Sequence, residues 1–149
     1  MNRNIKKVAV LGSGIMGSRI ACYFANIGVE VLLLDIIPKE LTPIESAKNL
    51  TLDNKNVRNE ALQAAIKSSP APLYDIAFAS RIATGNFDDN MKEIADYDWV
   101  IEVVVENIKI KHLVFEQVEK YRRPGTLVTS NTSGIPIHLM AEGRSDDFK

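Results

Sequence analysis

The stretch from Val8 to Asp35 reads VAVLGSGIMGSRIACYFANIGVEVLLLD, and it decides the fold of this chain. Two short apolar runs, Val8–Leu11 and Val29–Leu34, predict buried parallel strands. Between them, Met16–Ile27 has the composition of a helix, and Gly28 is expected to end it. The apolar residues expected on the buried face of that helix are Ile20, Phe24 and Ile27. A strand, a glycine turn, a helix and a second strand ending in an acid predict a dinucleotide-binding βαβ unit.

Three glycines in the turn occupy positions where a side chain would obstruct the fold or the ligand. Gly12 permits the tight turn, Gly14 lets the backbone approach a pyrophosphate, and Gly17 lets the helix lie close to the sheet. The free N–H groups and the dipole at the start of the helix favour phosphate. The residues expected to bind the cofactor here are Gly12, Ser13, Gly14, Ile15, Met16 and Gly17.

Asp35 ends the second strand, where a carboxylate can accept hydrogen bonds from both ribose hydroxyls of NAD. The same carboxylate repels a 2′-phosphate. Ile36 and Ile37 follow it, where an NADP enzyme usually has an arginine, and Lys39 is the nearby cation. The sequence therefore favours NAD over NADP as the cofactor.

The composition is that of an ordinary globular domain of 149 residues, with 46% hydrophobic and 25% charged residues. Eighteen basic and nineteen acidic residues give a net charge of −1, so we expect neither nucleic acid nor a membrane as a partner. No metal site is expected. The single cysteine, Cys22, is interpreted as a small buried residue, and the chain is expected to be cytoplasmic.

Beyond Asp35, strand and helix patterns alternate, which predicts an α/β fold: a Rossmann-type, doubly wound, mainly parallel sheet with helices on both faces. Residues 1–149 are expected to form this one domain. Residues 38–50 suggest only a short helix or turn, and the segment up to about residue 80 could form a helical arm. Further strands are expected at 81–84, 99–105 and 126–129, and helices at 59–68, 91–95 and 108–121. The apolar side of the last helix is expected to carry Ile110, Val114, Phe115 and Val118. Glu102 interrupts an apolar strand, so it should either point to a partner or lie where water reaches the sheet.

Polar residues follow the predicted later strands, at the edge where such sheets bind ligands. Glu106 and Lys111 lie around the start of the helix at 108–121, and Ser133 belongs to the polar loop SNTSG. From spacing alone, Glu106 could instead stabilise the N-terminus of that helix, and Ser133 could cap a helix before Pro136.

The motifs GSGIMG, VVVEN followed by Lys111, and SNTSG together resemble the NAD-binding domain of the 3-hydroxyacyl-CoA dehydrogenases of fatty-acid β-oxidation. The resemblance implies that Glu106 and Lys111 bind the nicotinamide half of NAD. It also implies that Ser133 is a catalytic residue that holds the oxygen on substrate C3 while a 3-ketoacyl-CoA forms. The arm after Asp35 would then help to receive coenzyme A, with Lys55, Arg58 and Lys67 as candidates, although the sequence favours interpreting these as solvated helix charges.

The resemblance also implies parts that do not occur in these 149 residues. A catalytic histidine is expected downstream of the SNTSG loop, followed by an all-helical domain that completes the substrate and dimer surfaces. His112, interpreted as a solvated residue, and His138, on a helix flank, are not expected to replace that base. We therefore expect a fragment that binds NAD but is inactive alone, from an enzyme that is a homodimer when complete. The sequences TSGI and MAEGRSDDF near the C-terminus also resemble those of bacterial multifunctional β-oxidation enzymes.

Two other functions remain open from the sequence. The chain could belong to a β-hydroxyacid dehydrogenase acting on a small free acid, or to a non-catalytic module that senses NAD(H). The first differs in its substrate, and the second would lack the downstream histidine.

Overall fold

A computed structural model describes residues 4–37 and 57–149, and the segment expected as a short helix or turn at 38–50 lies outside them. Within the described residues, five parallel strands form one sheet in the order β3-β2-β1-β4-β5. The order reverses beside β1, which pairs with both β2 and β4. The strands are β1 (Lys7–Leu11), β2 (Glu30–Asp35), β3 (Ile82–Asn86), β4 (Trp99–Glu102) and β5 (Leu127–Ser130).

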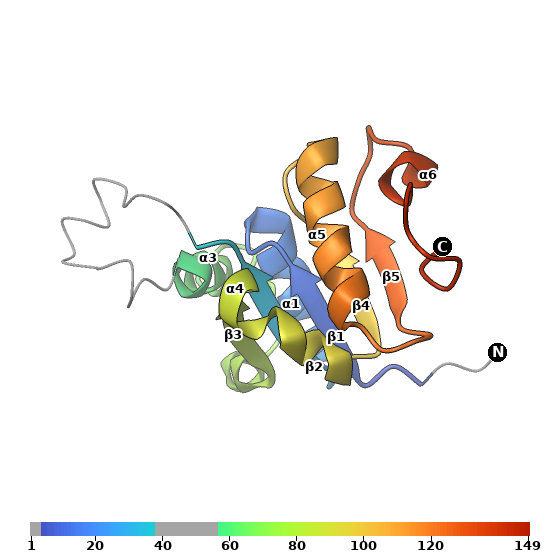
Figure 1. Ribbon diagram of the computed structural model, residues 1–149. Helices are drawn as coiled ribbons and strands as arrows, with labels where there is room; N and C mark the ends of the chain where they lie inside the picture. The colour runs from blue at the N-terminus through green and yellow to red at the C-terminus, as the bar shows by residue number, and fades with distance from the viewer. Residues whose placement is uncertain (1–3, 38–56) are drawn as a thin grey trace.

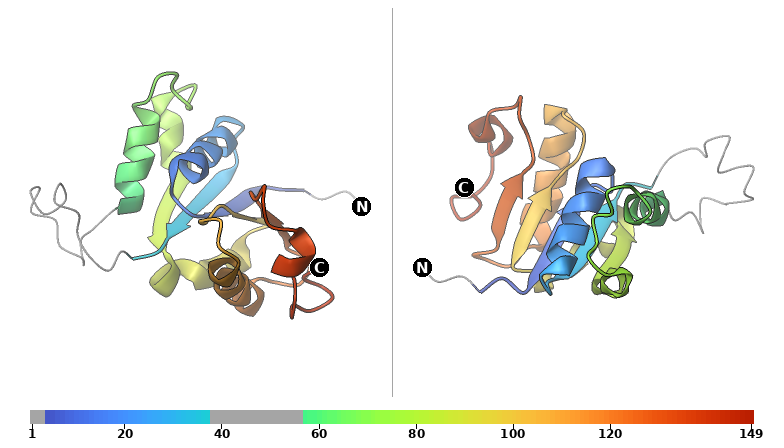
Figure 2. Two further views of the ribbon diagram at one scale, coloured as in Figure 1. Left: turned by 90° about the horizontal axis from the view of Figure 1, so that it is seen from above. Right: turned by 180° about the vertical axis from the view of Figure 1, so that it is seen from behind.

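Helices cover both faces of the sheet (Figures 1 and 2). One face carries α1 (Ile15–Asn26), α3 (Val57–Ile66) and the 3₁₀ segment η1 (Ile76–Arg81). The other carries α5 (Ile108–Tyr121), α4 (Phe87–Asn90) and the 3₁₀ segment η2 (Met91–Asp96), and the short α6 (Ile137–Met140) packs beside α5. The predicted Rossmann-type doubly wound fold is confirmed.

Strand β1 lies at the centre of the core and is buried on both faces. Val8 and Val10 pack with the α1 side, while Ala9 and Leu11 pack with the α5 side. Successive residues of a strand point to opposite faces, so a strand between two helical layers needs a continuous apolar run. This requirement explains why the apolar run Val8–Leu11 predicts a buried strand.

Helix α1 buries small residues rather than the large ones predicted. Its buried residues are Gly17, Ser18, Ala21, Cys22 and Ala25. The expectation for Ile27 is wrong, since that side chain is 72% exposed, while Ile20 and Phe24 pack only at the margin of the core. The helix lies too close to the sheet for large side chains. Gly28 ends it with a φ of +84°, as predicted.

Some element boundaries differ from the prediction. Strand β4 ends at Glu102 instead of Val105, because the Glu102 carboxylate accepts a hydrogen bond from the Val104 N–H (2.6 Å) and the chain leaves the sheet there. The helix expected at 91–95 is a 3₁₀ segment preceded by α4, whose first turn is capped by the Asn86 side chain. Helix α5 has the predicted bounds. Among the described residues, no helix has both the length and the apolar character needed to cross a membrane.

Candidate functional site

The carboxyl ends of the strands bring together the polar groups that the sequence singled out. The glycine turn follows β1, Asp35 ends β2, Glu106 follows β4, and Ser133 follows β5. These segments lie at the edge of the sheet where α1 and α5 begin (Figure 2). In open α/β sheets, ligands bind at this edge beside the reversal of strand order, here between β1 and β4.

The glycine turn has the three steric properties that were predicted for it. Gly12 has a φ of +118°, and a Cβ there would lie 2.5 Å from the Val103 carbonyl oxygen. A Cβ on Gly17 would lie 1.8 Å from the Gly12 carbonyl oxygen. A Cβ on Gly14 would meet no heavy atom within 4 Å. Gly12 and Gly17 are therefore required by the fold, whereas Gly14 faces open space beside the start of α1, where a phosphate can approach.

Asp35 is held in place by the glycine turn. One of its carboxylate oxygens accepts hydrogen bonds from the Ser13 N–H (2.7 Å) and the Ser13 hydroxyl (2.5 Å), and the other accepts one from the Ile36 N–H (2.7 Å). Ser13 itself is only 2% exposed. The contact that Ser13 makes in this structure is therefore with Asp35, which it orients.

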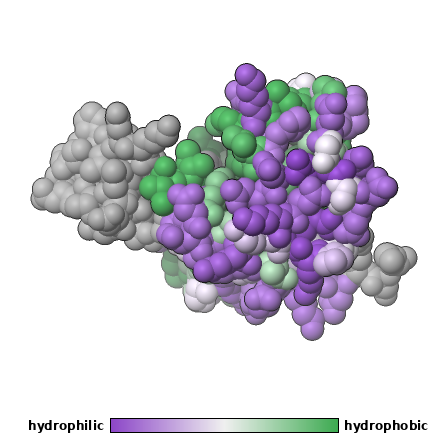
Figure 3. Space-filling view, in the orientation of Figure 1, coloured by the Kyte–Doolittle hydropathy of each residue, from purple (hydrophilic) through white to green (hydrophobic). Residues whose placement is uncertain are grey.

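An apolar cavity of about 460 Å³ begins at the residues directly after Asp35. Its apolar lining comes from the end of β2, from α4 and η2, and from the first two turns of α5. Figure 3 shows hydrophobic side chains gathered at this upper side of the molecule. The apolar residues that line it are Ile36, Ile37, Phe87, Met91, Ile110, Leu113 and Val114. The cavity can accept a flat apolar group attached to whatever Asp35 binds.

Lys111 and Glu102 form a buried ion pair. The Lys111 ammonium lies 2.9 Å from each oxygen of the Glu102 carboxylate, and both side chains are 0% exposed. Lys111 thus takes the buried position that the apolar pattern of α5 assigned to Ile110, which is 38% exposed. Of the two alternatives for Glu102, a partner is correct and a solvated position is wrong, and the partner is Lys111.

Glu106 reaches across to the loop after β5. One carboxylate oxygen accepts hydrogen bonds from the Thr132 hydroxyl and from the Gly134 N–H (3.0 Å), and the other lies 3.3 Å from the Lys111 ammonium. These contacts, with Thr132 first, lower the pKa of Glu106 from 4.5 to about 2. The Asn107 side chain caps α5 by accepting from Lys109 N and Ile110 N, so Glu106 is not the capping residue.

Ser133 is exposed, and it lies between the two residues that Glu106 holds. The alternative that Ser133 caps a helix is wrong, because α6 begins at Ile137 with Pro136 in the capping position and no side-chain cap. The site residue that the sequence reasoning missed is Thr132. Its tie to Glu106 spans 26 residues and depends on β4 and β5 lying side by side.

The two histidines lie on neighbouring helices. His112 was expected to be solvated, but it is half-buried and its Nε2 donates to the Leu139 carbonyl (2.7 Å), which ties α5 to α6. His138 is exposed on α6.

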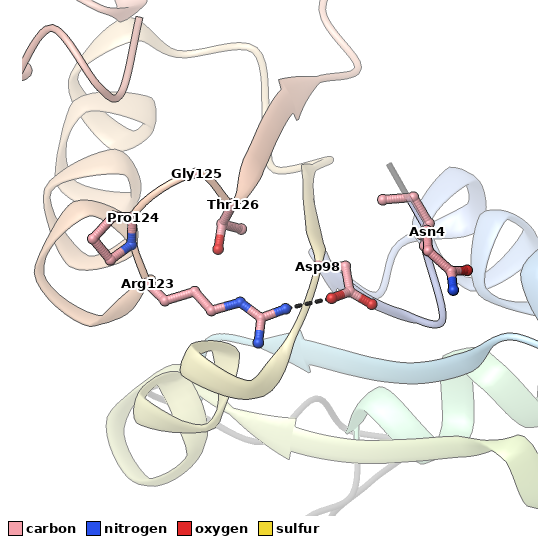
Figure 4. A pocket seen from close by; sticks show the side chains of 7 residues that line it. Asn4, Asp98, Arg123, Pro124, Gly125 and Thr126 are labelled. Atoms are coloured by element: carbon pink, nitrogen blue, oxygen red, sulfur yellow. Dashed lines mark hydrogen bonds and ion pairs between the residues drawn. The ribbon is translucent and has the colours of Figure 1, made fainter. Parts of the chain in front are cut away.

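A second cavity, of about 160 Å³, lies at the opposite edge of the sheet (Figure 4). There the Asp98 carboxylate accepts from Lys6 N (2.9 Å) and Lys7 N (3.0 Å) and pairs with Arg123. These bonds lower the pKa of Asp98 despite its partial burial. These bonds fasten the start of β1 to the segment that follows α5, which is a structural role.

Comparison with known proteins identifies the family to which this chain is similar. The sequence model of the family described as "3-hydroxyacyl-CoA dehydrogenase, NAD binding domain" matches residues 7–149. A Bacillus subtilis protein named "Probable 3-hydroxyacyl-CoA dehydrogenase" is 50% identical over 153 residues, covering 100% of this chain and 19% of the relative. A Rickettsia felis protein named for a fatty acid oxidation complex trifunctional enzyme is 36% identical over 149 residues, covering 100% of this chain and 19% of its own length.

The fold matches solved structures as well. A crystal structure of 3-hydroxybutyryl-CoA dehydrogenase from Escherichia coli K12 superposes with a TM-score of 0.66 at 28% identity. That match covers 97% of this chain and 28% of the solved one. The chain thus spans less than a third of each of these three relatives.

Proposed function

Because this chain belongs to the family of 3-hydroxyacyl-CoA dehydrogenase NAD-binding domains, we propose that its complete protein oxidises L-3-hydroxyacyl-CoA to 3-ketoacyl-CoA with NAD. The relatives are several times longer than 149 residues, so further domains of the same protein would supply the rest of the active site. The observation that carries the proposal is the meeting of Asp35, Glu106 and Ser133 at one edge of the sheet, beside the glycine turn.

The adenosine half of NAD fits the β1–β2 side of this edge. The open space at Gly14 and the start of α1 would receive the pyrophosphate, and Asp35 would accept both ribose hydroxyls. The adenine would then lie in the apolar cavity, between Ile36 and Ile37 on one side and Ile110 on the other. The residues that line this cavity include no Lys, Arg or His, which supports NAD over NADP.

The reacting half would lie between the loops after β4 and β5. When bound, NAD supplies the hydride acceptor. Glu106 and the adjacent Lys111 would contact the nicotinamide side, and the exposed Ser133 hydroxyl would donate a hydrogen bond to the oxygen on substrate C3. A base outside residues 1–149 would take the hydroxyl proton, since neither His112, which is bonded to Leu139, nor His138 belongs to this set of residues.

Three finer proposals accompany the reaction. The name of the Rickettsia relative supports a place in fatty-acid β-oxidation. The complete protein would be a homodimer, which light scattering tests. The free, buried Cys22 is compatible with a reducing compartment such as the cytoplasm, which cell fractionation tests.

The test uses residues 1–149 and the complete protein side by side. The fragment should bind NADH, seen as a change in nicotinamide fluorescence, without oxidising it in the presence of acetoacetyl-CoA. The complete protein should oxidise NADH with acetoacetyl-CoA, and Ser133→Ala should lower kcat while leaving NADH affinity nearly intact. Preference for a free 3-keto acid would indicate a β-hydroxyacid dehydrogenase, and NADH binding without turnover by the complete protein would indicate a sensing module.

A further inference from the structure

Glu106 is the exposed member of a cluster of three charged side chains beside the carboxyl end of β4. The cluster has two carboxylates, Glu102 and Glu106, and one ammonium, Lys111, so one negative charge is left over. We propose that this charge makes the site distinguish the two redox states of its cofactor: Glu106 strengthens the binding of NAD⁺ relative to that of NADH. The inference rests on the proposed function, because it requires the nicotinamide ring beside Glu106.

The charge of Lys111 is already balanced inside the protein. Its ammonium lies 2.9 Å from each oxygen of the Glu102 carboxylate and 3.3 Å from Glu106, and Lys111 and Glu102 are both 0% exposed. An ammonium has three N–H groups, so Lys111 can keep Glu102 and still donate a hydrogen bond toward Glu106 or a ligand. The negative charge that is left over therefore belongs to Glu106, whose side chain is 41% exposed.

The other contacts of Glu106 hold this charge in place without cancelling it. One carboxylate oxygen accepts hydrogen bonds from the Thr132 hydroxyl and the Gly134 N–H, which are neutral donors. Together with the neighbouring ammonium, these donors lower the pKa of Glu106 to about 2, so the carboxylate is ionised at neutral pH. The ligand edge thus carries a fixed, ionised carboxylate whichever form of the cofactor binds.

The position of Glu106 relative to the reacting atoms follows from Ser133. Thr132 and Gly134, which Glu106 holds, are the two neighbours of Ser133 in the chain. In the proposed reaction a hydride passes from substrate C3 to the nicotinamide ring while Ser133 binds the oxygen on C3. The ring must then lie beside this loop, and the carboxylate that reaches the loop from the β4 side is next to it.

A carboxylate at this place attracts one redox state of the ring and not the other. The nicotinamide ring carries a formal positive charge in NAD⁺ and none in NADH, whereas the remainder of the two molecules is the same. The negative charge of Glu106 therefore stabilises the complex with NAD⁺ selectively, and more so where water is excluded. Glu106 accordingly favours the loading of NAD⁺ and the release of NADH, an exchange that repeated oxidation of substrate requires.

The experiment measures the Kd of NAD⁺ and the Kd of NADH for the complete protein by isothermal titration. Low ionic strength is used, so that the exposed carboxylate is little screened. Glu106→Gln removes the charge and keeps an oxygen that can accept from Thr132 and Gly134, whereas Glu106→Asp keeps the charge on a shorter side chain. Glu116→Gln, the same change at an exposed position of α5, is the control. Circular dichroism establishes that each variant is folded.

We expect Glu106→Gln to lower the ratio of the Kd for NADH to the Kd for NAD⁺ by about tenfold, chiefly by raising the Kd for NAD⁺. Glu106→Asp should keep this ratio close to that of the wild type, because the charge remains, even where the shorter side chain raises both Kd values. Glu116→Gln should change neither Kd.

Two results would overturn the inference. An equal rise of both Kd values in Glu106→Gln would show that Glu106 only holds the loop. Unchanged Kd values in that variant would show that its charge does not act on the ring. The proposed reaction is tested separately: if the complete wild-type protein binds both dinucleotides but does not oxidise NADH with acetoacetyl-CoA, that reaction is wrong, and the ratio of Kd values still decides the role of Glu106.

Discussion

The turn after β1 and the loops after β4 and β5 present different chemical groups at the site: the turn presents backbone, and the loops present side chains. The turn presents backbone: Gly14 is open, and Gly12 and Gly17 leave no room for a Cβ. The two later loops present side chains that are tied to each other through Glu106 and to the core through the buried Lys111. A backbone cradle is shared by many dinucleotide-binding proteins, whereas a network of side chains can be specific to one reaction. The site therefore has two physically separate halves. The backbone half is the generic turn after β1, and the side-chain half is the more specific pair of loops after β4 and β5.

The largest loss of stability is expected from a substitution in the side-chain half of the site. Lys111→Met leaves the Glu102 carboxylate buried and without its cation, which should lower the free energy of unfolding by about 3–5 kcal/mol. Urea unfolding measures this loss. Lys109→Met, at an exposed position of the same helix, should stay within about 0.5 kcal/mol of wild type. Equal stability of the two variants would mean that the pair is not an essential tie.

In the backbone half, the largest loss of stability is expected from a substitution at Gly17. A Cβ there meets the Gly12 carbonyl oxygen at 1.8 Å, and neither backbone can yield easily, so Gly17→Ala should cost about 3 kcal/mol of unfolding free energy. Gly14→Ala is the matched control, because its Cβ enters open space and should cost less than about 1 kcal/mol. Thermal unfolding compares the two.

The same control variant tests for the ligand. Gly14→Ala should weaken NAD binding while the protein stays folded, because its methyl group occupies the space proposed for the pyrophosphate. Unchanged NAD affinity in Gly14→Ala would place the phosphates elsewhere.

Asp35→Ala should weaken NAD binding by about 1.5–3 kcal/mol, the value of hydrogen bonds to a charged group. NADP binding should weaken less or improve, because the repulsive carboxylate is gone. Isothermal titration with both dinucleotides measures the difference. Asp88→Ala removes an exposed carboxylate at the same apolar cavity and should leave both affinities near wild type. Equal losses of NAD affinity in the two variants would argue against a ribose contact by Asp35.

The backbone half could be predicted from the sequence because its determinants are local. The glycine spacing, the apolar strands and Asp35 lie within one stretch of 28 residues, 8 to 35, and the structure confirms the steric reasons for Gly12 and Gly17. The NAD cofactor and the family were predicted from the same residues together with the later motifs, and the family match confirms them.

The side-chain half could be predicted only in part, because its contacts join residues that are distant in the chain. Periodicity placed Ile110 in the core, but a carboxylate on another element, Glu102, draws Lys111 inside instead. Likewise, Thr132 meets Glu106 only because the register of β4 and β5 sets Glu102 beside Ser130. No local pattern encodes that register, so the residues near Ser133 were identified but their connections were not.

The smallest effect is expected from removing one of those connections, the hydrogen bond from the Thr132 hydroxyl to Glu106. Thr132→Val removes the hydroxyl that contributes most to the low pKa of Glu106, so that pKa should rise from about 2 toward 4.5. The stability that a lowered carboxyl pKa gives is present above pH 4.5 and is lost as the pH falls toward 2, so the variant should show a shallower acid dependence in this window. Carbon-13 NMR of the Glu106 carboxyl follows the titration directly. Thr129→Val, whose hydroxyl bonds Trp99 on the neighbouring strand, should leave the Glu106 titration unchanged. If Thr132→Val also leaves it unchanged, the Gly134 N–H and Lys111 suffice to hold Glu106, and the loop carrying Ser133 is fastened from one side only.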